Sequence, residues 1–286
     1  VIAGYVRSPF HLAGKGALAR VRPDDLAAQT IRGLVEKTGV KAEDIEDIVL
    51  GCAFPEGEQG FNIARLIGLL ADLPLSVGGM TVNRFCGSSM SSVHIAAGQI
   101  QLGAGEAFIC AGVESMSRVP MMGFNPLPNP ELAKKSAAYM GMGDTAENVA
   151  TKYQITRAQQ EAFAVASQDK AAAAIAAGKL EAEIVPITTK AGVVDKDGTP
   201  RAGTTTETQS SAGQGRKDRS ASVSVLVRNR TSDVSLSSFR STSLAEWLLS
   251  RASAAAVVRL DALSQSDIGQ LAKGVLGVKR IPVELE

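Results

Sequence analysis

The chain has 286 residues, of which 45% are hydrophobic and only 4% aromatic, and its formal net charge is +1. This length supports one large domain or two smaller ones, with a core built mainly from aliphatic side chains. A net charge so close to zero gives no reason to expect nucleic acid or an anionic membrane surface as a partner.

Three cysteines, Cys52, Cys86 and Cys110, are spread along the chain without CxxC spacing. That pattern argues against a disulfide framework or a zinc site, so we expect a reducing, cytoplasmic location and no bound metal. No apolar run approaches transmembrane length, and no signal peptide is visible. We therefore expect no membrane insertion.

Strand-like and helical segments alternate over the first 117 residues. We expect strands at residues 1–6, 45–51, 81–85 and 107–112, and helices at residues 22–39, 62–70 and 86–103. This alternation predicts an α/β fold with a mostly parallel sheet covered by helices.

The character changes from about residue 118. Residues 120–130 are rich in Pro, Met, Gly and Asn, which excludes a regular element there. Helices are expected at residues 145–153 and 156–177, the second with Thr156 and Gln159 as a capping box. A strand-like run follows at residues 184–189.

A second change follows residue 208. Residues 209–286 hold 15 serines, against 10 in all the preceding residues. Periodicity is weak, although a strand at 222–227 and helices at 244–258 and 266–276 are compatible with it. The segment is Ser/Arg-rich and carries little structural information.

Cys86 ends a β-prone run and is followed by small residues that predict the start of a helix. A thiol at the positive end of a helix dipole is a candidate nucleophile. Free cysteine is also among the most buried residue types. Placement alone leaves the catalytic and the structural interpretation open.

The two histidines are poor partners for this thiol. His94 lies eight residues beyond Cys86 on the expected helix, about 12 Å along its axis, and a general base needs contact near 3 Å. We expect His94 to be satisfied in the packing. His11 follows the first strand, where it is either a solvent-exposed loop residue, which we favour, or part of a cleft.

Three further residues have alternative roles. Cys110 lies inside an apolar strand and is expected in the core. Cys52, at a strand end, is a core or a pocket-wall residue. Glu114 also follows a strand, where carboxylates can act in catalysis, but we favour a structural hydrogen-bonding role at the junction with the next region.

The segment around Cys86, TVNRFCGSSM at residues 81–90, resembles the acylated-cysteine segment of thiolases. Five further segments match that family in order along residues 1–208. These are RSPF at 7–10, NIAR at 62–65, GVESMS at 112–117, MGDTAEN at 142–148 and EIVP at 183–186. The 120–130 insert is similar to the 3-ketoacyl-CoA thiolases of fatty-acid β-oxidation.

The resemblance implies a layered αβαβα thiolase fold. Residues 1–117 would form an N-terminal core half with the nucleophile, and residues 118–208 a loop domain that covers CoA and makes tetramer contacts. The C-terminal core half would be missing, and residues 209–286 would be an atypical segment, as a frameshift would produce.

The resemblance also implies the chemistry of an acetyl-CoA C-acyltransferase. Cys86 would take the acyl chain of a 3-ketoacyl-CoA, and free CoA would then remove it. CoA is thus a substrate and no cofactor is expected. Met142 would line the acyl pocket, and the protein would be a homo-oligomer, a dimer or a tetramer.

Family segments that carry an activating His and a second Cys are absent after residue 208. A non-catalytic acyl-CoA-binding or subunit-interaction protein is therefore the alternative function. A ketoacyl synthase is a third possibility, but the VNRFC and TAEN segments argue against it.

Overall fold

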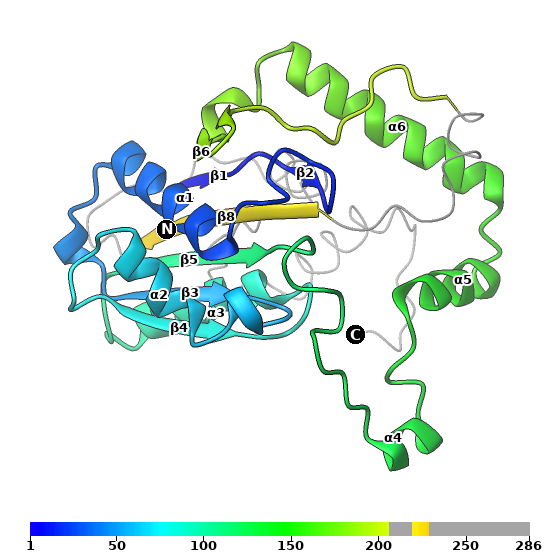
Figure 1. The fold of residues 1–286 in the computed structure, drawn as a ribbon, viewed down its shortest axis with the longest axis horizontal. Helices are drawn as coiled ribbons and strands as arrows, with labels where there is room; N and C mark the ends of the chain where they lie inside the picture. The colour runs from blue at the N-terminus through cyan, green and yellow to red at the C-terminus, as the bar shows by residue number, and fades with distance from the viewer. Residues whose placement is uncertain (206–218, 229–286) are drawn as a thin grey trace, which may run out of the picture.

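A mixed β-sheet forms the centre of the molecule in the computed structural model (Figure 1). The structure describes residues 1–205 and, for the backbone alone, residues 219–228. The strands are β1 (Ile2–Arg7), β2 (His11–Leu12), β3 (Asp47–Gly51), β4 (Gly78–Val82), β5 (Ala107–Glu114), β6 (Ile187–Thr189), β7 (Gly192–Val194) and β8 (Arg219–Arg228). The helices are α1 (Pro23–Thr38), α2 (Ile63–Leu70), α3 (Ser88–Gln101), α4 (Pro130–Lys135), α5 (Met142–Lys152) and α6 (Arg157–Ala176), with short 3₁₀ turns at Ala42–Asp44, Gly57–Gln59 and Glu181–Glu183.

The strand order is β1-β8-β5-β3-β4, and β2 also pairs with β8. β3 runs parallel to β4 and β5, whereas β8 runs antiparallel to both β1 and β5. The carboxyl ends of β3, β4 and β5 therefore meet at one edge of the sheet. The expected α/β class is confirmed, and the expected strand at 222–227 is the centre of β8.

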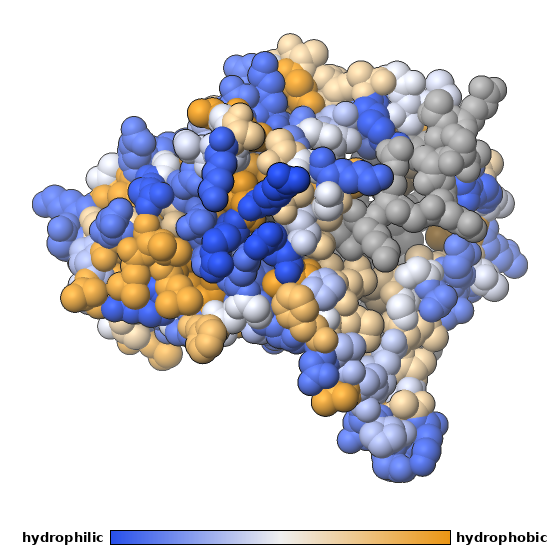
Figure 2. Space-filling model, in the orientation of Figure 1, coloured by the Kyte–Doolittle hydropathy of each residue, from blue (hydrophilic) through white to orange (hydrophobic). Residues whose placement is uncertain are grey.

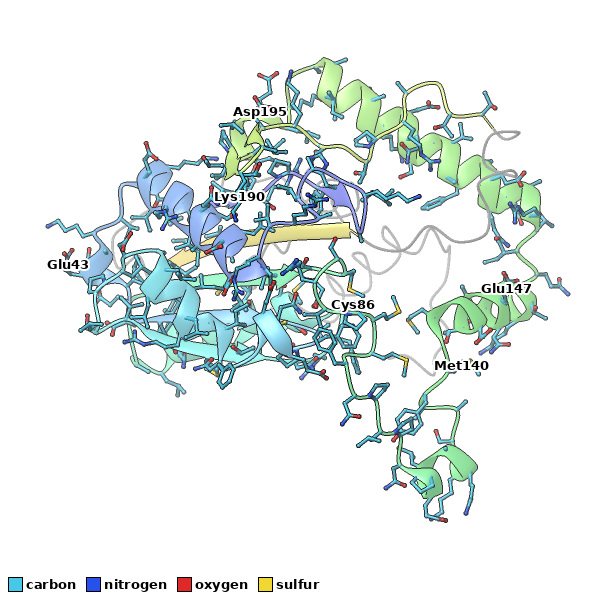
Figure 3. All side chains as sticks on the ribbon, in the orientation of Figure 1. Glu43, Cys86, Met140, Glu147, Lys190 and Asp195 are labelled. Carbon is cyan, nitrogen blue, oxygen red and sulfur yellow. The ribbon has the colours of Figure 1, made fainter. Side chains whose placement is uncertain are left out.

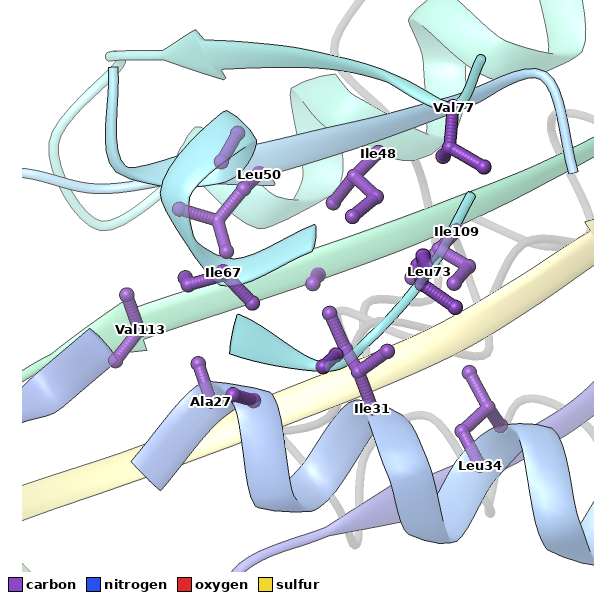
Figure 4. Packing of buried hydrophobic residues seen from close by; sticks show 14 of the residues in the cluster. Ala27, Ile31, Leu34, Ile48, Leu50, Ile67, Leu73, Val77, Ile109 and Val113 are labelled. Carbon is purple, nitrogen blue, oxygen red and sulfur yellow. The ribbon is translucent and has the colours of Figure 1, made fainter. Parts of the chain in front are cut away.

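Helices cover both faces of the sheet. Seven of the eight residues of β5 are buried, as expected for a strand covered on both sides. Ile109 and Val113 pack toward α1 and α2, together with Ile48 of β3 and Ile31 of α1 (Figure 4). On the opposite face, a smaller cluster joins Phe108 and Cys110 of β5 to Val93 and Ala96 of α3.

Local signals set the ends of the long helices. Pro23 begins α1, and Gly39 ends it in the left-handed region with φ 63°. Thr156 caps α6, and its side chain and that of Gln159 bond each other's backbone amides, which confirms the expected capping box.

Two expected boundaries at the Cys86 segment are wrong. The strand expected at residues 81–85 is β4, Gly78–Val82, and the helix expected from Cys86 begins at Ser88. The two glycines that open β4 are poor strand formers, but a Cβ at Gly79 would collide with the backbone of Arg65 at the start of α2. Close packing of α2 on the sheet therefore decides where β4 starts.

Helices α4, α5 and α6 stand apart from the sheet and bury none of their residues (Figure 1). The chain then returns to the core. Ile187 of β6 is buried with Leu18 and Leu26, and the buried Arg7 side chain bonds Glu183 at 2.8 Å and Asp197 at 2.7 Å. The expected helices at 244–258 and 266–276 lie outside the described residues.

Candidate functional site

Cys86 lies in the turn that joins β4 to α3, at the edge of the core (Figure 3). Gly87 is the N-cap of α3, so Cys86 precedes the first helical residue by two positions. Its side chain is exposed in the described structure. Phe85, just before it, has a φ of 45°, a left-handed conformation that is uncommon for a bulky residue.

Two glycines beneath α3 bring its first turn onto the sheet. Gly51 of β3 and Gly112 of β5 are paired in register. A Cβ at Gly51 would collide with the backbone of Ser88 and Ser89, and one at Gly112 with the Ser89 side chain. These positions thus place the amino end of α3, and Cys86 with it, against the carboxyl ends of parallel strands, where α/β proteins commonly bind ligands.

A buried glutamine joins the loop after β3 to the end of β5. Gln59 is fully buried, and its amide nitrogen donates to the Phe54 carbonyl at 2.8 Å and to Glu114 at 2.7 Å. Its amide oxygen accepts from the Ser115 N–H at 2.7 Å. Nothing in the sequence marks Gln59, because a glutamine in a loop carries no local signal of burial.

Glu114 also accepts the Ala53 N–H at 2.7 Å, which confirms its structural hydrogen-bonding role at this junction. Burial raises the pKa of Glu114 above its ordinary value, and the hydrogen bonds that it accepts oppose the shift without reversing it. The carboxyl group thus helps to join the loop after β3 to the end of β5, beneath the site.

The other two cysteines are buried, and their thiols are poor nucleophiles. Burial raises the pKa of Cys110 to about 12, in the core as expected. Burial, with a smaller contribution from the Glu114 charge, raises the pKa of Cys52 to about 12. Of the alternatives for Cys52, the structure supports the core, in the cluster beneath α1 and α2.

Neither histidine forms a hydrogen bond with Cys86 in the described part of the chain. His94 is exposed on α3, so its expected burial in the packing is wrong. Its neighbour Val93 faces the core, and adjacent residues of a helix point about 100° apart. His11 is half-buried in β2, and its ring contacts the Lys196 carbonyl at 3.0 Å and the Ala17 N–H at 3.3 Å.

Met142 is the first residue of α5 and is 68% exposed. The neighbouring Met140 and Glu147 are labelled in Figure 3, to one side of the core and its Cys86. A role of Met142 in an acyl pocket stays a prediction.

No group of three or more His, Cys, Asp or Glu side chains suited to a metal ion occurs among the described residues. In the same part of the chain, no helix combines the length and the apolar character needed to cross a membrane.

The family model for the thiolase N-terminal domain matches residues 1–213. The chain belongs to the thiolase family. The match includes the whole region in which the six sequence segments resemble thiolases, and it confirms that resemblance. β8 lies beyond the matched residues.

Relatives of the chain carry the name 3-ketoacyl-CoA thiolase. That of Bacillus subtilis is 48% identical over 201 residues, which are 70% of this chain and 51% of the relative. Those of Psychrobacter arcticus and of Acinetobacter baumannii strain AYE are 45% and 44% identical over 188 residues, 65% of this chain and 48% of each relative. The chain thus spans about half the length of these relatives.

Proposed function

We propose that this chain carries the acyl-accepting step of a thiolase, with Cys86 as the nucleophile. The observation that carries the proposal is the contrast among the three thiols. Cys86 is exposed at the amino end of α3, whereas Cys52 and Cys110 are buried and have pKa values raised to about 12. The names of the relatives support 3-ketoacyl-CoA as the substrate class.

In the proposed step, the Cys86 sulfur bonds to the keto carbon of a 3-ketoacyl-CoA. The bond between that carbon and the α-carbon breaks. The α-carbon takes up one proton, which balances the proton that the Cys86 thiol has lost, and leaves as acetyl-CoA. The shortened acyl chain stays on Cys86 as a thioester until free CoA removes it. Backbone amides at a helix start are suitable donors for the oxyanion that forms in such a step.

A non-catalytic acyl-CoA-binding or subunit-interaction role is the second candidate. The position of the histidines favours it. His94 points to solvent along α3, and His11 is bonded to backbone groups of other segments. No side chain among the described residues forms a hydrogen bond with the Cys86 thiol, so we expect acylation of Cys86 with little or no sustained turnover.

The test is to incubate the purified 286-residue chain with acetoacetyl-CoA, first alone and then with free CoA. Intact-mass analysis detects the acetyl adduct, and loss of the 3-ketoacyl absorbance follows thiolysis. Cys86→Ala serves as the control. An adduct that maps to Cys86 is the expected result.

Turnover above the Cys86→Ala control would defeat the non-catalytic alternative. Retention of acyl-CoA by a folded chain that forms no adduct would instead contradict the proposed step.

A further inference from the structure

The exposed side chain of Asn83 holds the backbone just before Cys86. Its amide oxygen accepts a hydrogen bond from the Phe85 N–H at 2.8 Å. Its amide nitrogen donates to the Ala53 carbonyl at 3.0 Å. Asn83 thus ties the turn that carries the thiol to the loop after β3.

Ser88 holds the same turn from the other side. Its hydroxyl accepts a hydrogen bond from the Arg84 N–H at 2.8 Å and donates to the Phe85 carbonyl at 2.5 Å. Ser88 is buried and is the first residue of α3. Two side chains therefore bond the peptide groups on both sides of Phe85.

The loop that receives Asn83 is itself anchored in the core. Ala53 donates its N–H to Glu114 at the end of β5. The next residue, Phe54, has its ring centroid 6.0 Å from that of Phe85. The hydrogen bonds thus run from the sheet, through Ala53 and Asn83, to the residue that precedes Cys86.

The conformation of Phe85 explains why such bonds are needed. A non-glycine residue with φ 45° is strained, and it persists only where the surroundings fix it. The bend at Phe85 lets the chain turn from β4 into α3 within five residues. If Phe85 relaxes, Cys86 leaves its place before the first helical turn.

We propose that Asn83 and Ser88 are positioning residues for Cys86, whose hydrogen bonds to the Arg84–Phe85 backbone hold the thiol at the amino end of α3. The proposal rests on the proposed function in taking Cys86 as the nucleophile. Thiols at the amino end of a helix are more reactive than other exposed thiols. Loss of the positioning bonds takes the Cys86 thiol away from that end and slows its reaction with an electrophile.

The experiment measures the rate constant for alkylation of Cys86 by iodoacetamide in the full chain at one fixed pH, with peptide mapping to identify the site. Asn83→Ala and Ser88→Ala are each expected to slow alkylation at least threefold. Asn83→Ser keeps a short neutral acceptor for the Phe85 N–H, so it is expected to recover most of the loss. Ser91→Ala, on the same helix but with no part in these bonds, is the matched control and should stay within twofold of the wild type.

The buried cysteines report whether a variant is folded, because Cys52 and Cys110 react only once the core opens. If Ser88→Ala unfolds by this criterion, the proposal is tested by the two Asn83 variants alone. Asn83 is exposed, so its substitution leaves the core packing unchanged. An Asn83→Ala rate within twofold of the wild type, or faster, would overturn the proposal. Equal slowing by Asn83→Ala and Asn83→Ser would also overturn it, because the Phe85 bond would then not be what holds the thiol.

Iodoacetamide needs no CoA site, so the two proposals fail separately. A chain that is alkylated as expected but forms no acyl adduct contradicts the proposed function alone. A chain that is acylated at Cys86, with alkylation that is indifferent to Asn83 and Ser88, contradicts the positioning role alone.

Discussion

The buried carboxyl group of Glu114 makes the stability of the fold depend on pH. Its carboxyl group lies at the end of β5, where Gln59 and the Ala53 N–H donate to it. Burial raises its pKa in the folded state. The folded chain therefore binds more protons than the unfolded chain at pH values between the ordinary and the raised pKa, and its free energy of unfolding falls as the pH rises through that window.

Glu114→Gln removes this titration. The free energy of unfolding of the wild type, minus that of the variant, is expected to decrease as the pH rises from about 4.3, the ordinary pKa of Glu. Urea denaturation at a series of pH values between about 4 and 7 measures it. A difference that stays constant or grows with pH would contradict the assignment. The subtraction cancels the titration of the other carboxyl groups.

The signal for Cys86 is local, so the sequence alone singles out this residue. Its role as the nucleophile stays a prediction, and the strand and helix boundaries predicted beside it are wrong. The sequence did not predict the roles of Gln59, Asn83 and Ser88, because these roles depend on backbone groups of other segments or on a bend at Phe85. The fully buried Gln59 bonds Ser115, 56 positions away. No periodicity or motif reports a contact of that kind.

At the scale of elements, the packing of α3 on the sheet decides where the site is. Gly51 and Gly112 leave room for its first turn at the carboxyl ends of β3 and β5. Gly98, farther along α3, has open space where a Cβ would be. The packing of α3 thus requires a glycine at position 51 but not at position 98.

Gly51→Ala is expected to destabilise the fold by about 1–3 kcal/mol, because the added methyl group overpacks the contact with Ser88 and Ser89. Gly98→Ala is the matched control and should stabilise α3 by about 0.5–1 kcal/mol. Thermal or urea unfolding measures both. Equal effects of the two substitutions would show that α3 does not rest on Gly51.

At the scale of the molecule, β8 completes the sheet between β1 and β5. Val225 pairs in register with Tyr5 on one side and with Cys110 on the other.

Apolar side chains remain exposed elsewhere. They include Leu69, Leu70 and Leu75. Figure 2 shows an apolar patch on the side of the molecule where Figure 1 labels α2. The expected homo-oligomer and the frameshift origin of residues 209–286 stay predictions.

Val225→Pro tests the central place of β8. Proline cannot donate to a ladder, and the loss of a hydrogen bond inside a sheet costs about 2 kcal/mol, so Tm is expected to fall by roughly 4–8 °C. Val225→Thr keeps the backbone N–H and the β-branched shape, and should lower Tm far less. A proline variant with an unchanged Tm would mean that residues 219–228 do not pair with both neighbours.

Local signals along the chain were enough to predict the family, the α/β class, the helix ends marked by Pro23, Gly39 and Thr156, and Cys86 as the candidate nucleophile. Each of these features depends on residues that are close to one another in the sequence. The fold was needed to learn that β4 begins at glycine, that β8 lies inside the sheet, that His94 faces solvent, and that Asn83 and Ser88 bond the turn at Cys86. Those features depend on pairing and packing between distant segments, where burial and backbone hydrogen bonds outweigh local preference.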